Sequence, residues 1–219
     1  MSTTVAIALF TVLVAGALWG VETGRRGVLL FCKPAATAAL LPVVLDATEG
    51  LLPRGHFAWL VTAGILLSLV GDVALLDARP RAFLTGLASF LLAHVCYTLA
   101  FLTMARPGIA TVAAIAVAAA TSVTMVRSLW KRLHRLRAPV AAYAAAISAM
   151  VIVAVSTIGG VAQPVASFAI AGGAFLFYLS DANLAWIHFG RVYPHAQTIT
   201  LGLYWSGQLG IALGARWVG

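Results

Sequence analysis

Two aspartates stand inside stretches that otherwise look like membrane spans: Asp72 in LLSLVGDVALL and Asp181 in AFLFYLSDANLAW. A carboxylate at bilayer depth costs on the order of 3 kcal/mol, so its retention indicates a function inside the membrane. Surroundings of low dielectric constant favour the neutral form of a carboxyl, whereas a nearby cation or hydrogen-bond donor favours the anion. Such acids serve either acid–base catalysis or proton-coupled transport, and the two residues alone leave both classes open.

The composition indicates a polytopic helical membrane protein. The 219 residues are 62% hydrophobic and 9% charged, whereas soluble domains are roughly 45 to 50% apolar and about 25% charged. The apolar runs are continuous, as in IATVAAIAVAAA, while the strands of a membrane barrel would alternate apolar and polar residues. The net charge of +8 is confined to short loops, which is typical of topology signals, and no nucleic-acid partner is expected.

Eight apolar runs have the length of about 17 to 25 residues that a bilayer crossing needs. Because the connections between them are short, we expect an all-α membrane helix bundle in which residues 1–219 form a single transmembrane domain. The expected spans are residues 4–20, 28–45, 57–76, 82–104, 109–129, 138–158, 165–189 and 195–218.

The basic residues predict how these spans are oriented. Of the 14 Lys and Arg residues, only Arg54, Arg106 and Arg216 fall on one side, and the loop RSLWKRLHRLR supplies much of the excess on the other. Basic loops stay in the cytoplasm, so both termini are expected outside and both aspartates in the cytoplasmic half. A bacterial inner (cell) membrane is the expected location.

Other polar residues are expected near the depth of the aspartates. Lys33 and Tyr143 lie early in their spans, His94 lies near the middle of its span, and Tyr204 and Gln208 lie near mid-depth in the last one. Each also has a simpler explanation. Lys33 could extend to the interface, His94 could be a core histidine bonded to a backbone carbonyl, and the tyrosines could belong to an interfacial belt.

The position of Asp72 is also open to a simpler explanation, since it could lie at a frayed helix end close to Asp77 and Arg79. Asp181 is followed by several more apolar residues and is expected to be the deeper acid. Cys32 and Cys96 show no metal-like spacing, and no metal or cofactor is expected.

Two pairs of spans have a similar layout. Asp72 precedes His94 by 22 positions, and Asp181 precedes Tyr204 by 23. Four spans separate the two pairs, so a parallel 4+4 repeat is possible, as in transporters built from parallel repeats.

An ordered set of residues along most of the chain resembles the YhhN-like family of integral membrane proteins, whose characterised members are lysoplasmalogenases. One local departure is Trp205, where a second tyrosine is expected. The set comprises Lys33-Pro34, Ser68 with Gly71-Asp72, Phe83, Gly86, Phe90, His94, Tyr97, Tyr143, Met150, Phe177, Ser180-Asp181, Tyr204 and Gln208.

The resemblance implies hydrolysis of the vinyl ether bond of a lysoplasmalogen to a fatty aldehyde and a glycerophospho-base. Protonation of the β-carbon leaves an oxocarbenium ion, which water attacks to form a hemiacetal that collapses. Under this hypothesis Asp181 is the general acid and Asp72 the base or electrostatic partner, although the reverse assignment stays open.

The resemblance also implies supporting roles for neighbouring residues. Lys33 could hold one acid ionised or meet the lipid phosphate, and the lysophospholipid substrate would enter from the bilayer with its head at the basic side. The remaining candidates for positioning water, the ether oxygen or the pocket walls are Tyr143, Tyr204, His94, Gln208, Ser68 and Ser180.

Two other functions remain open on the sequence. A proton-coupled transporter of a small solute or lipid would also use buried acids, but the acid-bearing spans lack the proline breaks typical of discontinuous helices. A structural or regulatory membrane protein is the third possibility. Serine hydrolysis is not supported, because the sequence contains no Gly-x-Ser-x-Gly motif.

Overall fold

The computed structural model describes residues 2–45 and 55–218, and every regular element in those ranges is a helix. Most helices begin and end within a few residues of the expected spans. In order they are α1 (Thr3–Glu22), α2 (Arg26–Ala38), α3 (Leu41–Leu45), α4 (Gly55–Ala74), α5 (Pro80–Leu102), α6 (Ile109–Leu133), the 3-10 turn η2 (His134–Leu136), α7 (Arg137–Ser156), α8 (Pro164–Phe189) and α9 (Ala196–Val218).

Six helical stretches within the described residues are long and apolar enough to cross a membrane. One of them, Ile109–Ser156, contains both α6 and α7, because η2 joins these helices without a break. Helix α9 is not among the six, and it carries Gln197, Gln208 and Arg216. The chain is thus a multi-pass membrane protein with a helical bundle, but the eight spans expected from the sequence are not confirmed.

The second apolar run divides into two helices where the sequence predicts one continuous span. Helix α2 ends at Ala38, and the five-residue α3 starts at Leu41. Pro34 within α2 has no N–H to donate, which removes one helical hydrogen bond close to Lys33. Residues 26–45 are nevertheless one candidate span, so the span expected over residues 28–45 is supported, with a break in the helix after Ala38 that the sequence did not predict.

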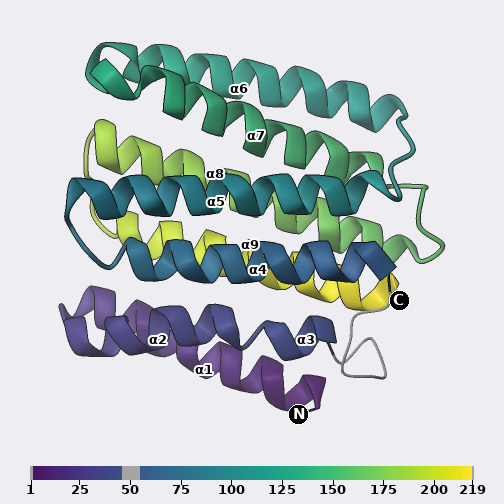
Figure 1. The fold of residues 1–219 in the computed structure, drawn as a ribbon, viewed down its shortest axis with the longest axis horizontal. Coiled ribbons are helices and arrows are strands. Elements are labelled where there is room, and N and C mark those ends of the chain that lie inside the picture. Colours follow the sequence, from purple (N-terminus) through teal and green to yellow (C-terminus); the bar gives the residue numbers. More distant parts are fainter. Residues whose placement is uncertain (1, 46–54, 219) are drawn as a thin grey trace.

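The helices run along the long axis of the molecule (Figure 1). In that view α6 and α7 form one edge of the bundle, α1, α2 and α3 form the opposite edge, and α4, α5, α8 and α9 lie between them. Both termini lie at the same end, so the connections after α1, α4, α6 and α8 gather at the other end.

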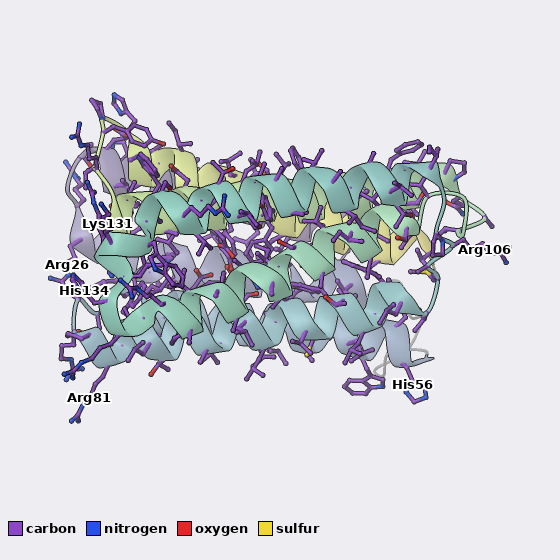
Figure 2. The ribbon with its side chains drawn as sticks, turned by 90° about the horizontal axis from the view of Figure 1, so that it is seen from above. Arg26, His56, Arg81, Arg106, Lys131 and His134 are labelled. Atoms are coloured by element: carbon purple, nitrogen blue, oxygen red, sulfur yellow. The ribbon has the colours of Figure 1, made fainter. Side chains whose placement is uncertain are left out.

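Basic side chains gather at the end of the bundle opposite the termini (Figure 2). Arg26, Arg81 and Lys131 lie at this end, which we call the basic end, whereas Arg106 lies at the end that holds the termini. Arg54, which the sequence assigns to the less basic side, lies outside the described residues.

Glycines bring the helices that carry the aspartates into close contact with their neighbours. A Cβ added at Gly173 of α8 would lie 2.6 Å from the carbonyl oxygen of Gly207 of α9. One added at Gly71 of α4 would lie 2.6 Å from the ring of Phe90 of α5. Because only glycine fits at such contacts, α4 is held against α5, and α8 against α9.

Candidate active site

A cavity of about 660 Å³ runs from the basic end into the bundle and reaches both aspartates. Its walls come from α1, α2, α4, α5, α8 and α9, and its inner part is lined by Lys33, Asp72, Asp181 and Tyr204. Within the part of the chain that the structure describes, no group of three or more His, Cys, Asp or Glu side chains could hold a metal ion.

Asp72 of α4 is 1% exposed and is surrounded by donors. Thr37 Oγ1 donates to its Oδ2 at 2.5 Å, and the Tyr204 hydroxyl donates to the same oxygen at 2.7 Å. The Lys33 ammonium lies 3.4 Å from Oδ1 and donates to the backbone carbonyl of Asp72 at 3.3 Å. We call Lys33, Thr37, Asp72 and Tyr204 the Asp72 cluster; its two hydroxyls and ammonium favour the carboxylate anion.

Two further donors fix the direction of the hydrogen bonds in the Asp72 cluster. The Trp205 indole donates from Nε1 to Thr37 Oγ1 at 3.3 Å, and the Gln208 amide donates from Nε2 to the Tyr204 hydroxyl at 3.5 Å. An indole N–H can only donate. The Thr37 and Tyr204 hydroxyls thus accept hydrogen bonds from these N–H groups and donate their own hydrogens to Asp72.

Asp181 of α8 is 9% exposed and has a different set of neighbours. The Tyr143 hydroxyl donates to its Oδ2 at 2.5 Å, and Nε2 of His94 lies 3.4 Å from the same oxygen. The His94 and Tyr143 rings meet edge to face with centroids 5.2 Å apart. We call these three residues the Asp181 cluster; no Lys or Arg among the described residues pairs with its carboxyl.

The two clusters connect the halves of the chain in the same way. Each acid contacts one side chain from an earlier helix of its own half and one ring from the other half. These contacts are Asp72 with Lys33 of α2 and Tyr204 of α9, and Asp181 with Tyr143 of α7 and His94 of α5.

Phe177 of α8 packs between the two clusters. Its ring centroid lies 4.8 Å from that of His94 and 5.2 Å from that of Tyr204, and the side chain is fully buried. An apolar ring thus contacts one polar ring from each cluster, which keeps the surroundings of the two carboxyls distinct.

The structure resolves the alternatives that the sequence left open for Lys33 and Asp72. Lys33 is 7% exposed and faces Asp72, so it does not extend to the interface. Asp72 is near the end of α4 but enclosed, so it is not an exposed residue at a frayed helix end. Asp72 is the more enclosed of the two acids, whereas Asp181 lies further from the end of its helix at the basic end, so its greater depth in the membrane stays a prediction.

His94 is fully buried, and neither of its ring nitrogens has a hydrogen-bond partner among the described residues. The alternative of a core histidine bonded to a backbone carbonyl is therefore not found in this part of the chain. Its nearest polar neighbour is the Asp181 carboxyl, close enough for a small movement to form a hydrogen bond.

The remaining candidates support the walls of the site. Gln208 is fully buried and accepts a hydrogen bond from the Tyr97 hydroxyl at 2.7 Å. Ser68 is buried one turn before Asp72 and does not line the cavity. Ser180 lines the cavity, but its hydroxyl donates to the carbonyl of Thr200 at 2.9 Å and so ties α8 to α9.

Sequence reasoning missed Thr37 and treated Trp205 only as a departure from a pattern. Thr37 is one helical turn after Lys33, so the spacing of four could have placed both side chains on the face that meets Asp72. Nothing in the sequence indicates that the Trp205 indole donates to Thr37, because the two residues lie on helices far apart in the chain.

Comparisons with known proteins find relatives that are similar over most of the chain. Lysoplasmalogenase TMEM86B of Sus scrofa is 31% identical over 188 residues, covering 85% of this chain and 74% of that protein. Lysoplasmalogenase TMEM86B of Homo sapiens is 33% identical over 187 residues, covering 83% and 75%. A lysoplasmalogenase of Mycobacterium bovis is 33% identical over 178 residues, covering 78% and 64%. No solved structure matches the chain.

The model of the YhhN family matches residues 28–215, a range that contains every residue of both clusters. The resemblance seen in the sequence is thereby confirmed, and this chain belongs to the YhhN family.

Proposed function

We propose that this protein hydrolyses the vinyl ether bond of a lysoplasmalogen, giving a fatty aldehyde and a glycerophospho-base. The observation that carries the proposal is the pair of carboxyls that line one cavity in unlike surroundings. The similarity to mammalian and mycobacterial lysoplasmalogenases over most of the chain supports it.

Asp72 is the anionic member of the pair in this proposal. Its two hydroxyl donors and the Lys33 ammonium stabilise negative charge, and the N–H groups of Trp205 and Gln208 that donate to Thr37 and Tyr204 favour the orientation in which those hydroxyls donate to Asp72. A fixed carboxylate can stabilise an oxocarbenium ion and take a proton from the attacking water.

Asp181 is the proton donor. Its Oδ2 accepts a hydrogen bond from the Tyr143 hydroxyl, and its other close neighbour is the imidazole of His94. Without a cation beside it, a carboxyl in a low-dielectric bundle keeps its proton more readily than Asp72 does. Because Oδ2 is held by Tyr143, Oδ1 is the oxygen left to carry the proton to carbon.

The proposed steps restore both acids. Asp181 gives its proton to the β-carbon of the vinyl ether, and the α-carbon becomes part of an oxocarbenium ion. Water adds to that carbon while Asp72 takes one of its protons, which forms the hemiacetal. Asp72 then returns its proton to the glyceryl oxygen as the carbon–oxygen bond breaks, and Asp181 takes the hemiacetal hydroxyl proton as the aldehyde forms.

We also propose a membrane topology. α6 and α7 lie side by side and are joined at the basic end, and α9 runs beside α8, so each would cross the bilayer separately and give eight crossings in one transmembrane domain (Figure 1). With the basic end in the cytoplasm of a bacterial cell, both termini lie outside and the cavity opens to the inner leaflet.

The parallel 4+4 repeat is likewise a proposal. Two sets of contacts support it. Within each half the acid contacts a side chain of an earlier helix, Lys33 for Asp72 and Tyr143 for Asp181, and across the halves it contacts a ring, Tyr204 for Asp72 and His94 for Asp181. Lys33 precedes Asp72 by 39 positions, and Tyr143 precedes Asp181 by 38. A duplicated four-helix unit accounts for both pairings.

The experiment that tests the function is release of aldehyde by purified protein in detergent from a lysoplasmalogen, with the saturated alkyl ether lysolipid as control. The proposal expects aldehyde from the vinyl ether alone. Absence of aldehyde from protein that remains folded would reject the hydrolase and leave the acids to proton-coupled transport.

A further inference from the structure

Beyond Asp181 the reaction cavity continues into a narrow hollow between α5, α7 and α8, with a volume of about 40 Å³. The two spaces have several walls in common, so this hollow adjoins the reaction cavity at Asp181. The shared residues are Leu75, Phe83, Phe90, Asp181 and Leu184.

A second hollow, of about 50 Å³, follows between α6, α7 and α8. It shares Val140, Tyr143, Asp181 and Ala185 with the first hollow, so the two hollows adjoin at the acid and at the tyrosine that donates to it. Asp181 therefore lies at the junction of the reaction cavity and both hollows.

The second hollow leads to the outer surface of the bundle. A groove of about 680 Å³ lies between α6 and α7 and shares Ser122, Val126 and Ala144 with the hollow. Only these small or medium side chains separate the two spaces. Helices α6 and α7 form the edge of the bundle, so the groove faces the surrounding bilayer (Figure 1).

A group of hydroxyls closes the deeper end of the second hollow. The Tyr178 hydroxyl is 2.6 Å from Thr121 Oγ1 and 2.8 Å from Ser122 Oγ, and Ser122 Oγ is 2.8 Å from Ser148 Oγ. These contacts join α6 to α7 and α8. A chain entering from Asp181 is therefore directed outward between α6 and α7.

The two sides of Asp181 differ in chemistry. Towards the basic end the cavity carries charged and polar groups, including Lys33, Glu22 and His195. Away from it, the walls of the two hollows are apolar apart from a few hydroxyls and the acid itself. A lysolipid whose scissile bond lies at Asp181 has its head on one side of that point and its hydrocarbon chain on the other.

We propose that these hollows and the outer groove form the binding track for the alkenyl chain, which also releases the aldehyde to the bilayer. The inference rests on the proposed hydrolase function and assigns it a subsite. The hollows are narrow, so entry of the chain separates α6 from α7 at Val126 and Ala144. The track sets the preference for long chains, because a longer chain makes more contacts along it.

The test compares hexadecenyl and butenyl lysolipids on Ala144→Phe and on the matched control Ala142→Phe. Ala142 is on the same helix but exposed and outside the hollows and the groove. The phenyl ring at position 144 should lower kcat/KM for the hexadecenyl substrate by at least about tenfold and leave the butenyl substrate within about twofold. Equal effects of the two variants on both substrates would overturn the track.

A binding measurement decides the question if Ala144→Phe does not fold. In a Cys32→Ala/Cys96→Ala background, Ala144→Cys is labelled with a thiol reagent in the presence of hexadecyl or butyl ether lysolipid, which cannot be hydrolysed. Protection by the hexadecyl ether alone supports the track, and equal labelling with both ethers rejects it. Failure of the proposed function itself is distinct, since wild-type protein would then release aldehyde from neither alkenyl substrate.

Discussion

The Asp72 and Asp181 clusters place the same type of side chain on one cavity and surround it differently. Asp72 accepts hydrogen bonds from two hydroxyls and faces an ammonium. Asp181 accepts a hydrogen bond from one hydroxyl and faces an imidazole. Asp72 is also the more enclosed acid, yet it is the one expected to be ionised. In the proposed mechanism the hydroxyl donors and the ammonium around Asp72, and not its burial alone, make it the ionised acid.

The largest expected effect is on the proton donor. Asp181→Asn keeps the size of the side chain but cannot give a proton to carbon, so we expect aldehyde release to fall by about a thousandfold. Aldehyde is measured with purified, folded protein. A loss smaller than about tenfold would show that another group protonates the substrate.

Asp77→Asn is the matched control for this amide substitution. Asp77 is an acid in the loop between α4 and α5, and hydrogen bonds from Arg79 keep its pKa below the ordinary value. Asp77 lines the same cavity, but it is an anion near neutral pH and no proton donor, and its exposed ion pair with Arg79 contributes little to stability. We expect this variant to stay close to wild-type activity.

Asp72→Asn and Asp181→Asn should differ in stability, although both are expected to lose activity. Asp72→Asn leaves the Lys33 ammonium buried without its counter-ion, which should lower the free energy of unfolding by about 3 kcal/mol. Asp181→Asn weakens one hydrogen bond, at about 1 kcal/mol. Unfolding in detergent measures the difference, and equal losses would contradict the unlike surroundings of the two acids.

A double variant sharpens this comparison. Lys33→Met with Asp72→Asn removes both charges and should regain part of the stability lost in Asp72→Asn, because no unpaired ion remains. Activity should stay low, since the anion is still missing. Recovery of activity together with stability would show that Asp72 only serves to balance Lys33.

A smaller effect is expected at Thr37. Thr37→Val keeps the branched shape and removes the hydroxyl that donates to Asp72, so kcat should fall by about tenfold, in line with a lost hydrogen bond to a charged group. Thr37→Ser keeps the hydroxyl and should restore most of the rate. If Val and Ser behave alike, Thr37 acts by packing alone.

The smallest effect is expected at Ser180, beside the acid in sequence. Its hydroxyl donates to the Thr200 carbonyl and not to Asp181, so Ser180→Ala should lower the free energy of unfolding by about 1 kcal/mol and leave kcat nearly unchanged. A large loss of kcat in a stable variant would bring Ser180 into the reaction.

Much of the fold and site could be read from the sequence. Long apolar runs determine where helices form, so most helix ranges follow from hydropathy. The two aspartates could be identified because a charge inside an apolar run is costly. Four further polar residues were then expected near the depth of the two acids, and the structure brings each of them to one acid. They are Lys33, Tyr143, His94 and Tyr204.

The parts that could not be predicted depend on contacts between distant helices. Hydropathy gives the depth of a residue but not which helix it faces, so the pairing of Asp72 with Tyr204 was not foreseen. The hydrogen bond from the Trp205 indole to the Thr37 hydroxyl could not be predicted for the same reason. The relative exposure of the two acids also depends on how side chains close the cavity, which span boundaries do not reveal.

The measurement that tests the central claim most directly is cleavage of a lysoplasmalogen by the wild-type protein in heavy water, with the aldehyde trapped by reduction as it forms. If Asp181 protonates the β-carbon, the trapped product carries a single deuterium on the carbon next to the former aldehyde carbon. Aldehyde without that deuterium, or no aldehyde at all, would contradict acid catalysis by the two carboxyls.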